Sequence, residues 1–532
     1  MTHRPPVAWQ QFLVAVSFAN LCFLRRWKES ITYTPPDQYL MLVPPAPAQY
    51  YASMFDTLLV AAFTWAFIVW MERNRQGAAY KSGRYAFLVL MLLPLNALRE
   101  ALSGDFPYLH GELIRGIGLP ATLGVITIVG VGLLVVILCW PDQLYRSLRA
   151  ALLFLSPFVL LTFGQAGLDA RHYDPAGFQD KPLAQPIANR TDNPRVAWVV
   201  FDELDERITF DARPRDLQLP ELDRFRNGSL HASEAFPPTG ATLSSLPSLI
   251  LGRKVKRVEK LGPSELRIGF GQSDAMVDWS TQPNVFSRAR TMGLNTALAG
   301  WYHPYCRILN QDLTACHWSE FEQVVNSVGR DFRTGVPRQL RSLFETSIYS
   351  PFGQSLLTQA RVRRETDLLS HALQYLTDPS MNLVFIHAQA PHSPYAYNRR
   401  TGQFNLSNSA VTGYVDSLAL TDRILGQFRS AMERAGLWGP AAVIISTDHW
   451  YRSARAFDGK LDRRVPFMIK LPGQTEGISY DSKINTVLTQ DLILAILRHD
   501  VSTPKDAAAW LDRHRDAIET APAAGREPTG ED

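Results

Sequence analysis

The run RVAWVVFDELD at 195–205 decides the fold, because in it an apolar strand ends on two carboxylates. Residues 195–201 are rich in Val, Trp and Phe, a composition typical of a buried strand. Asp202 and Glu203 follow directly. From here onward, strand-like runs alternate with helical patterns. This alternation predicts an α/β domain with a mostly parallel sheet flanked by helices.

Further runs of the same kind fix the outline of that domain. The predicted strands are 294–299, 383–388, 441–446 and 465–470, and the clearest predicted helices are 363–377 and 410–435. In open α/β sheets, ligands bind beyond the carboxyl ends of the strands. The residues that follow each strand are therefore the candidates for a functional site.

Acids and histidines follow three of the predicted strands. A single Asp after a strand is usually a turn or cap residue, but the same chemistry after three separate strands rarely arises by chance. Mixed carboxylate and imidazole ligands favour a divalent metal, Zn²⁺ first, with Mn²⁺ or Ca²⁺ as alternatives. The residues concerned are Asp202 and Glu203, His392 in the APHSPY loop at 390–395, and Asp448 and His449 in STDHW at 446–450.

The segment TGATLSSLPSLILG at 239–252 offers a nucleophile. Gly240 permits a tight turn, and Thr242 then begins an apolar helical run. A hydroxyl at a helix N-terminus lies beside free backbone N–H groups that can hold the oxyanions of a phosphate ester. The alternative is that Thr242 only caps the helix, which is a common role of Thr.

The first third of the chain reads as a membrane anchor. Lys and Arg residues in the connections 72–84 and 141–149 place those loops in the cytoplasm and the C-terminal domain outside, whereas the basic residues at 25–28 argue against this orientation. The segments long and apolar enough for transmembrane helices are 8–24, 53–71, 84–98, 118–140 and 148–166.

These patterns divide the chain into four parts. We expect a transmembrane anchor at 1–166, a linker at 167–193, a catalytic domain at 194–502 and a disordered tail at 503–532.

Two features bear on compartment and partners. Cys306 and Cys316 are either two separate buried thiols or a short-loop disulfide, and the disulfide would require an oxidising compartment. The formal net charge is only +4 over 532 residues, and the sequence has no basic helix. We therefore expect no nucleic-acid partner.

The order of these motifs resembles the alkaline phosphatase/sulfatase superfamily, in the membrane-anchored branch of phosphoethanolamine transferases and lipoteichoic acid synthases. The resemblance covers roughly 195–500, and members of the branch often carry five membrane helices. It implies metal ligands at Asp202, Thr242, Asp448 and His449, a nucleophile at Thr242, a catalytic or second-metal role for His392, and a match of Glu203 to the second acid of the family pattern. His303, in GWYHPYC, and Arg464 are further candidates for the site by their positions in the chain.

The resemblance also implies a reaction. A metal-dependent enzyme would transfer a phospho-head-group from a phospholipid to an alcohol or glycan acceptor through phospho-Thr242. It would do so outside the bacterial cytoplasmic membrane. The sulfatase pattern C-x-P-S-R is absent, and Thr cannot be oxidised to the aldehyde that sulfatases use. Two alternatives remain, a sulfatase-like hydrolase of phosphate or sulfate esters and a non-catalytic membrane scaffold.

The chain departs from the branch at two places. Trp450 stands where the motif after Asp448 and His449 normally has Gly. The histidine expected beyond that motif has no match, and Lys460, Arg463 and Arg464 lie in its place. Either departure would change the choice of substrate.

Overall fold

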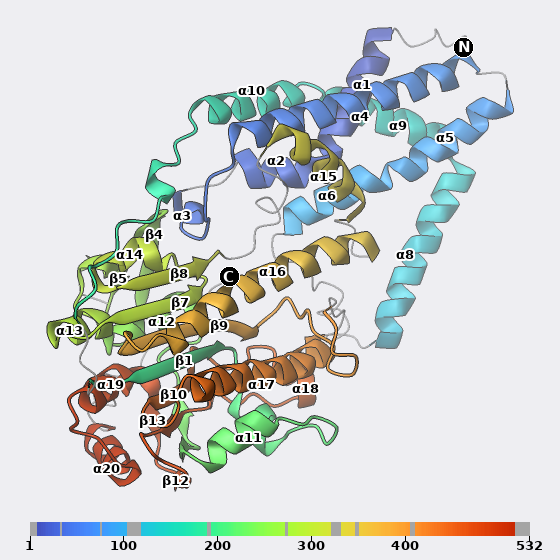
Figure 1. Cartoon of the computed structure of the whole chain (residues 1–532). Coiled ribbons are helices and arrows are strands. Elements are labelled where there is room, and N and C mark those ends of the chain that lie inside the picture. Colours follow the sequence, from blue (N-terminus) through green and yellow to red (C-terminus); the bar gives the residue numbers. More distant parts are fainter. Residues whose placement is uncertain are drawn as a thin grey trace.

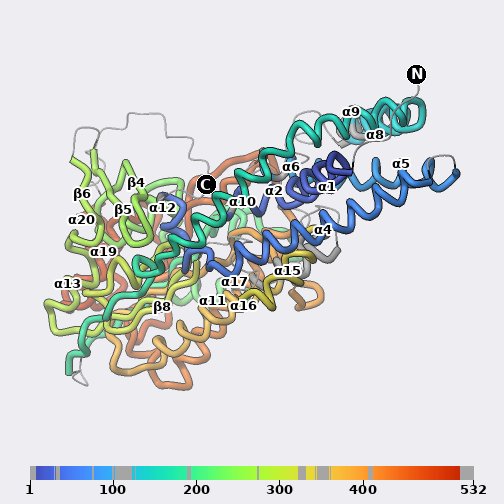
Figure 2. The backbone as a smooth tube through the Cα atoms, turned by 90° about the horizontal axis from the view of Figure 1, so that it is seen from above, coloured from blue at the N-terminus to red at the C-terminus, as the bar shows by residue number. Residues whose placement is uncertain are grey.

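The computed structural model describes residues 8–31, 35–74, 77–103, 119–188, 193–271, 275–320, 331–345, 351–404 and 410–515. The N-terminal third forms a set of helices, and the remainder forms an α/β domain (Figure 1). Seen from above, the helices run outward from the α/β domain as an elongated arm (Figure 2). The helices of the arm are α1 (Ala8–Cys22), α2 (Leu24–Ile31), α3 (Pro35–Gln38), α4 (Pro47–Arg73), α5 (Ala78–Leu90), α6 (Leu92–Ser103), α8 (Leu119–Cys139), α9 (Pro141–Leu155) and α10 (Phe158–Arg171).

Two stretches of the described chain are long and apolar enough to cross a membrane by length and composition, namely Pro47–Arg73 and Pro141–Arg171. The five spans expected from the sequence are therefore not confirmed. Helix α1 has 15 residues, about 22 Å at the usual helical rise, which is short of a hydrocarbon core of about 30 Å. The expected span at 84–98 is divided between α5 and α6 by a turn at Met91.

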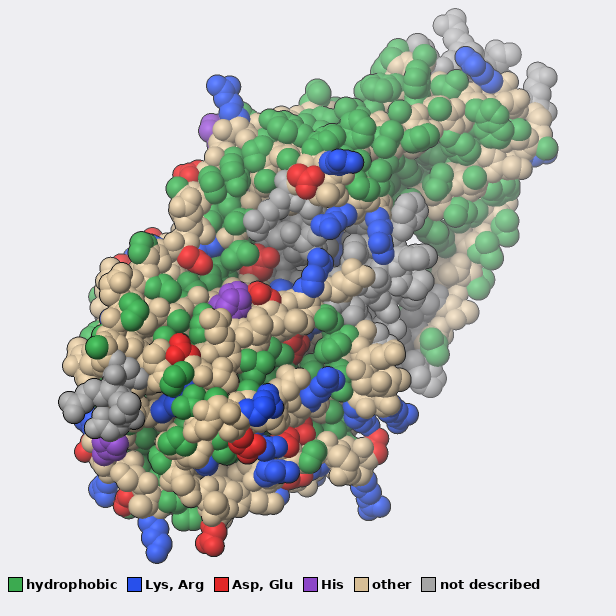
Figure 3. Space-filling model, in the orientation of Figure 1, with side chains coloured by type: hydrophobic (Ala, Val, Ile, Leu, Met, Phe, Trp, Pro, Cys, Tyr) green, Lys and Arg blue, Asp and Glu red, His purple; other side chains and the backbone are tan. Residues whose placement is uncertain are grey.

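The arm carries most of the exposed large apolar side chains. Phe63, Ile128, Phe154 and Leu160 are each more than 70% exposed. Figure 3 shows apolar atoms spread over the helices of the arm. In the described chain beyond residue 173, the only exposed large apolar side chains are Phe332 and Phe404, at 43% and 37%. An apolar surface of this extent marks a face that contacts lipid or another protein.

The core of the α/β domain is an eight-stranded sheet. Its order is β12 (Ile478–Tyr480), β2 (Leu230–Ala232), β11 (Met468–Lys470), β10 (Ala442–Thr447), β1 (Val196–Asp202), β9 (Leu383–Pro391), β7 (Thr296–Trp301) and β8 (Ala315–Ser319). The five strands from β10 to β8 are parallel, which confirms the mostly parallel sheet. Strand β11, predicted at 465–470, runs antiparallel to β10. Smaller sheets pair β3 (Ala235–Phe236) with β13 (Ile484–Asn485), and join β4 (Arg257–Gly262), β5 (Glu265–Gly269) and β6 (Val277–Asp278).

Helices cover both faces of the sheet, and successive side chains of β1 point alternately to the two faces. Val196, Trp198 and Val200 pack into a core with α12, α13, α19 and α20. The intervening residues pack into a second core with α11, α16 and α17. Every residue of β1 is buried, as expected for a strand covered on both sides. These helices are α11 (Pro220–Asn227), α12 (Thr242–Leu251), α13 (Val285–Thr291), α16 (Pro351–Thr377), α17 (Ala410–Arg434), α19 (Thr489–Leu497) and α20 (Pro504–His514). The described part of the domain also contains α14 (Tyr305–Ile308), α15 (Phe332–Glu345) and α18 (Arg455–Asp458).

The arm and the α/β domain are joined by direct contacts. Helix α15 packs on α4, where Ser53 Oγ donates to Gln339 Oε1 at 2.8 Å. The segment expected as a linker, 167–193, begins inside α10 and is then attached to the domain. Its Ala184 N–H donates to the carbonyls of Asn310 and Leu313 at 3.1 and 3.0 Å.

The prediction of a disordered tail from residue 503 is wrong for the segment that forms α20. The side chain of Thr503 accepts from the backbone N–H of Asp506 and caps α20, which begins at Pro504. Ala507, Trp510 and Leu511 are buried at helical spacing, so the segment packs on the core rather than remaining disordered. Residues 516–532 lie outside the described residues.

Candidate active site

Thr242 is the first residue of α12, and its side chain turns towards three neighbouring side chains. Its Oγ1 donates to Asp448 Oδ2 at 2.8 Å and lies 3.2 Å from His449 Nε2 and 3.5 Å from Asp202 Oδ2. The residue before the helix is Ala241, which makes no side-chain cap bond. Thr242 therefore does not act as the helix cap, the alternative that the sequence left open.

The Asp448 carboxylate is held in one orientation by backbone N–H groups. Its Oδ1 accepts from Glu203 N at 3.2 Å and from His449 N at 2.8 Å, which leaves Oδ2 for Thr242. Glu203 has a φ of 64°, a left-handed conformation that is costly for a residue with a Cβ. This strained turn places the Glu203 N–H against Asp448.

Two buried imidazoles direct an unprotonated nitrogen into the same space. Carbonyl oxygens only accept, so Nδ1 of His449 donates to Trp450 O at 2.9 Å and Nδ1 of His387 donates to Trp301 O at 3.0 Å. Burial lowers the pKa of both rings to about 4, so they are neutral near pH 7. Each Nε2 therefore carries a lone pair, and in His387 it faces Asp202 Oδ2 at 3.7 Å.

Lone pairs that face one another in a buried site repel unless a proton or a metal cation lies between them. Among the described residues, neither Asp202 Oδ1 nor His387 Nε2 has a hydrogen-bond partner. Burial raises the pKa of Asp202 well above its ordinary range, and the Asp448 carboxylate beside it adds to this. The donor atoms of Asp202, Asp448 and His449 lie within 4.8 Å of one another. Each imidazole also donates its other N–H to a backbone carbonyl, as metal-bound histidines do. The residues present therefore fit a divalent metal.

Of the further sequence candidates, His303 lies next to Thr242 without entering the cluster. It is fully buried, and its Nε2 donates to the backbone carbonyl of Thr242 at 3.3 Å. Its Nδ1 lies 2.7 Å from the hydroxyl of Tyr39, which comes from the arm. His303 therefore holds the start of α12.

His392 and Glu203 each have a hydrogen-bond partner outside the Thr242 cluster. The Nδ1 of His392 donates to Ser393 O at 2.5 Å, and its ring lies 5.2 Å from that of Trp301. A positive charge on the His392 ring would lower the pKa of Asp202. The Glu203 carboxylate accepts from Arg452 Nε at 3.2 Å.

Arg464 belongs to a separate ionic group. Its guanidinium donates to Asp462, Asp211 and Glu234 at 2.7, 2.8 and 3.2 Å. These bonds hold Arg464 among carboxylates outside the Thr242 cluster, which makes it a structural residue.

Trp450 packs on the turn that precedes the nucleophile. A Cβ on Gly240 would lie 2.6 Å from Cη2 of the indole, so the ring touches the bare backbone. The guanidinium of Arg463 lies over the ring at 5.0 Å from its centroid. Gly240 thus leaves room for the indole of Trp450, and the loop before Thr242 follows the shape of this ring.

Sequence reasoning missed two residues of this site. His387 stands in the quoted strand 383–388, and its signal was a polar residue near the carboxyl end of an apolar run. Tyr39 gave no signal, because the segment between α3 and α4 has no periodic pattern that points to the α/β domain.

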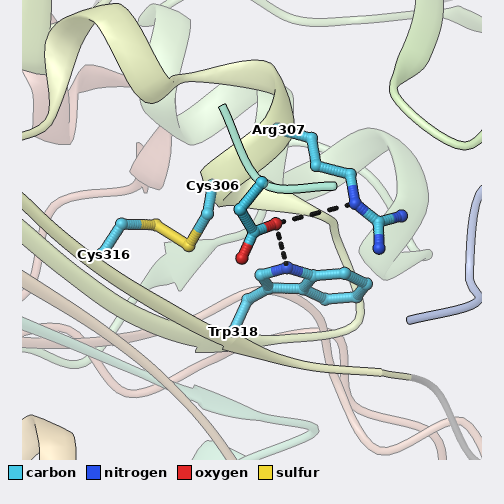
Figure 4. The surroundings of a disulfide bond; sticks show 5 residues. Cys306, Arg307, Cys316 and Trp318 are labelled. Atoms are coloured by element: carbon cyan, nitrogen blue, oxygen red, sulfur yellow. Dashed lines mark hydrogen bonds and ion pairs between the residues drawn. A yellow bond between two sulfur atoms is a disulfide. The ribbon is translucent and has the colours of Figure 1, made fainter. Parts of the chain in front are cut away.

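The disulfide between Cys306 and Cys316 is confirmed, and it links α14 to β8. Figure 4 shows Arg307 and Trp318 beside the disulfide, and Asp180 contacts both of them. Arg307 Nε is 3.6 Å from Asp180 Oδ1, and Trp318 Nε1 donates to the same oxygen at 3.3 Å. The disulfide thus stands where the linker meets the domain.

A hydroxyl, two carboxylates and two imidazoles at one edge of a parallel sheet are the donor set of a metal-dependent enzyme with a hydroxyl nucleophile. The family model described as Sulfatase matches residues 194–499, more than half of the chain, and the chain belongs to the sulfatase family. It thus carries the fold of the alkaline phosphatase/sulfatase superfamily, which acts on sulfate or phosphate esters. The comparison with curated proteins finds no match.

The chain is similar over part of its length to several solved structures. A PsFucS1 sulfatase from Pseudoalteromonas sp. is 14% identical, with a TM-score of 0.38, over 62% of this chain and 76% of that one. A phosphonate monoester hydrolase of Agrobacterium radiobacter is 13% identical, with a TM-score of 0.38, over 57% and 74%. Human ectonucleotide pyrophosphatase/phosphodiesterase 5 is 10% identical, with a TM-score of 0.36, over 57% and 95%.

Proposed function

We propose that this protein transfers a phospho-head-group from a phospholipid to an alcohol or glycan acceptor, through a covalent intermediate on Thr242. The observation that carries the proposal is the 2.8 Å hydrogen bond from Thr242 Oγ1 to Asp448 Oδ2 in a fully buried cluster. A hydroxyl is activated as a nucleophile when an adjacent base takes its proton. Thr at this position favours phosphoryl chemistry over the aldehyde chemistry of sulfatases.

Two displacement steps complete the reaction. In the first, Thr242 Oγ1 gives its proton to Asp448 Oδ2 and bonds to phosphorus, while the bond from phosphorus to the glycerol oxygen breaks. His392 supplies a proton to that leaving oxygen, and diacylglycerol departs. In the second, the acceptor hydroxyl loses its proton to the His392 ring and bonds to phosphorus. The bond to Thr242 Oγ1 breaks, and the proton on Asp448 Oδ2 returns to that oxygen.

The cluster has a second task, which is to stabilise charge. A divalent cation held by Asp202, Asp448, His449 and Thr242, with Zn²⁺ preferred and Mn²⁺ or Ca²⁺ as alternatives, would polarise the phosphoryl oxygens. His387 is a further donor for this cation by its position. The N-terminus of α12 directs backbone N–H groups towards the same anionic group.

Two features support an envelope location for the reaction. The exposed apolar surface of the arm suits insertion in the bacterial cytoplasmic membrane as a multi-pass anchor. The Cys306–Cys316 disulfide suits the oxidising, extracytoplasmic side. An anchor of this kind would hold the site at the bilayer surface, where a phospholipid donor is available.

The proposal is tested by diacylglycerol release from a mixed phospholipid extract by the full chain in detergent. We expect release by wild type, loss with a chelator or with Thr242→Ala, and no effect of the exposed control Thr281→Ala. Faster release on adding an alcohol acceptor identifies a transferase. A rate of diacylglycerol release that does not change when an acceptor is added identifies a hydrolase, the alternative that the family match also supports. No release by metal-loaded protein would contradict the proposal and favour a scaffold.

A further inference from the structure

A second group of metal-type side chains lies at the far edge of the sheet. His317 is on β8, and Asp367 and His371 are on α16. His317 Nε2 is 3.0 Å from Asp367 Oδ2, and His371 Nδ1 is 3.8 Å from Asp367 Oδ1. The donor atoms of all three lie within 4.8 Å of one another. We propose that these residues form a divalent-cation site, independent of the proposed function, that takes Zn²⁺.

The backbone explains why these side chains meet. Asp367 and His371 are four residues apart on α16, so they share one face of the helix. That face packs on β8, the last strand in the order of the sheet. His317 follows Cys316 directly, so the disulfide fixes the strand position from which the third side chain projects.

The two imidazoles lie face to face beside the Asp367 carboxylate, so one cation can bind in the plane of both rings once one ring rotates about its Cβ–Cγ bond. Their rings are stacked with centroids 3.7 Å apart and an interplanar angle of 3°, so two protonated rings would repel each other. Nδ1 of His371 donates to the backbone carbonyl of Asp367 at 3.0 Å, which leaves its Nε2 with a lone pair. A histidine bound to a metal usually donates its other N–H to such an acceptor.

The donor set and its exposure suit a structural or exchangeable zinc ion. Two nitrogens and one carboxylate oxygen are common zinc ligands, and water completes four-coordination. The side chains of His317, His371 and Asp367 are 20%, 34% and 56% exposed, so an ion and its water can enter from solvent. Bound there, the ion would join the edge strand to α16, beside the disulfide and Asp180.

Zinc titration of metal-stripped, full-length protein in detergent tests this site. His371→Ala is the main variant, because Ala keeps the helix. Asp367→Asn is the second variant, because it keeps side-chain size. His514→Ala is the control, since His514 is likewise a helical histidine whose Nδ1 donates to a backbone carbonyl and whose ring is stacked on another, that of Trp510. Asp448→Asn perturbs the Thr242 cluster alone.

We expect wild type and His514→Ala to bind one equivalent of Zn²⁺ that both His371→Ala and Asp367→Asn lose or bind at least about 10- to 100-fold more weakly. Asp448→Asn should keep that equivalent. Circular dichroism confirms that each variant is folded before titration. Identical stoichiometry and affinity in wild type, His371→Ala and Asp367→Asn would overturn the site, whatever the state of the proposed reaction.

Discussion

The hydroxyl of Tyr39 lies 2.7 Å from Nδ1 of His303, and through this pair the arm contacts the backbone of the nucleophile. Burial lowers the pKa of His303 to about 3, so the ring is neutral. Its Nε2 must donate to the Thr242 carbonyl, which can only accept. Nδ1 is then an acceptor, and the Tyr39 hydroxyl is its donor.

Tyr39→Phe removes that donor and leaves a buried nitrogen unpaired, at a cost of about 1–3 kcal/mol. Because the ring positions Thr242 through its backbone, we expect kcat for diacylglycerol release to fall several-fold with KM little changed. Tyr50→Phe is the matched control, because its buried hydroxyl donates to Ser30 O at 2.9 Å within the arm. Equal kinetics in the two variants would show that Tyr39 only packs.

Gly240→Ala should disturb the loop that carries Thr242. The new Cβ would lie 2.6 Å from Trp450 Cη2, and overpacking of this kind costs about 1–3 kcal/mol. Thermal unfolding should show the loss, and adding Trp450→Gly in the same chain should recover part of it. Gly439→Ala is the control, since nothing lies within 4 Å of a Cβ there. No difference between the two alanine variants would refute the contact.

The disulfide should contribute to stability and be visible chemically. It closes a loop of sequence separation 10, for which chain entropy gives about 3 kcal/mol. Alkylation of the denatured, unreduced chain should modify only Cys22 and Cys139, and reduction should expose two more thiols. Cys316→Ser should lower the unfolding midpoint, whereas the exposed Cys139→Ser should not. Four thiols without reduction would contradict the bridge.

The buried carboxyl of Asp205 should make the free energy of unfolding depend on pH. Burial raises its pKa to about 7 in the folded state, above the ordinary value of the unfolded chain. Its stabilising contribution is therefore complete below about pH 4 and is lost as pH rises through 7, by about 2 kcal/mol between pH 5.5 and 7. Unfolding midpoints of wild type and Asp205→Asn at pH 5.5 and 8.5 should shift in favour of the variant at the higher pH. A constant difference would contradict a raised pKa.

The sequence predicts the site where the functional residue stands at the end of a strand or the start of a helix that a local pattern reveals. Strands β1, β9 and β10 are continuous apolar runs, and their ends share one edge of the sheet, so the sequence pattern alone groups Asp202, Asp448 and His449. Thr242 was found because a helix start has a recognisable pattern. All three predicted side chains around it lie within 3.5 Å of its hydroxyl.

Other parts depended on long-range contacts. Tyr39 and His303 are 264 residues apart, and no periodicity relates them. Strands β2 and β12 have three residues each, too few for alternation to appear. Counting apolar residues identified the helical arm but not the turn at Met91, because composition does not report where a helix breaks.

The central claim is that Thr242 becomes covalently modified, and intact mass tests it most directly. Metal-loaded wild type, Thr242→Ala and Thr242→Ser would be incubated with a mixed phospholipid extract and quenched in acid. The account predicts an added phospho-head-group mass on wild type, the same mass on Thr242→Ser, and none on Thr242→Ala, with the modified peptide containing residue 242. An equal adduct on Thr242→Ala, or diacylglycerol release by Thr242→Ala at the wild-type rate, would contradict it.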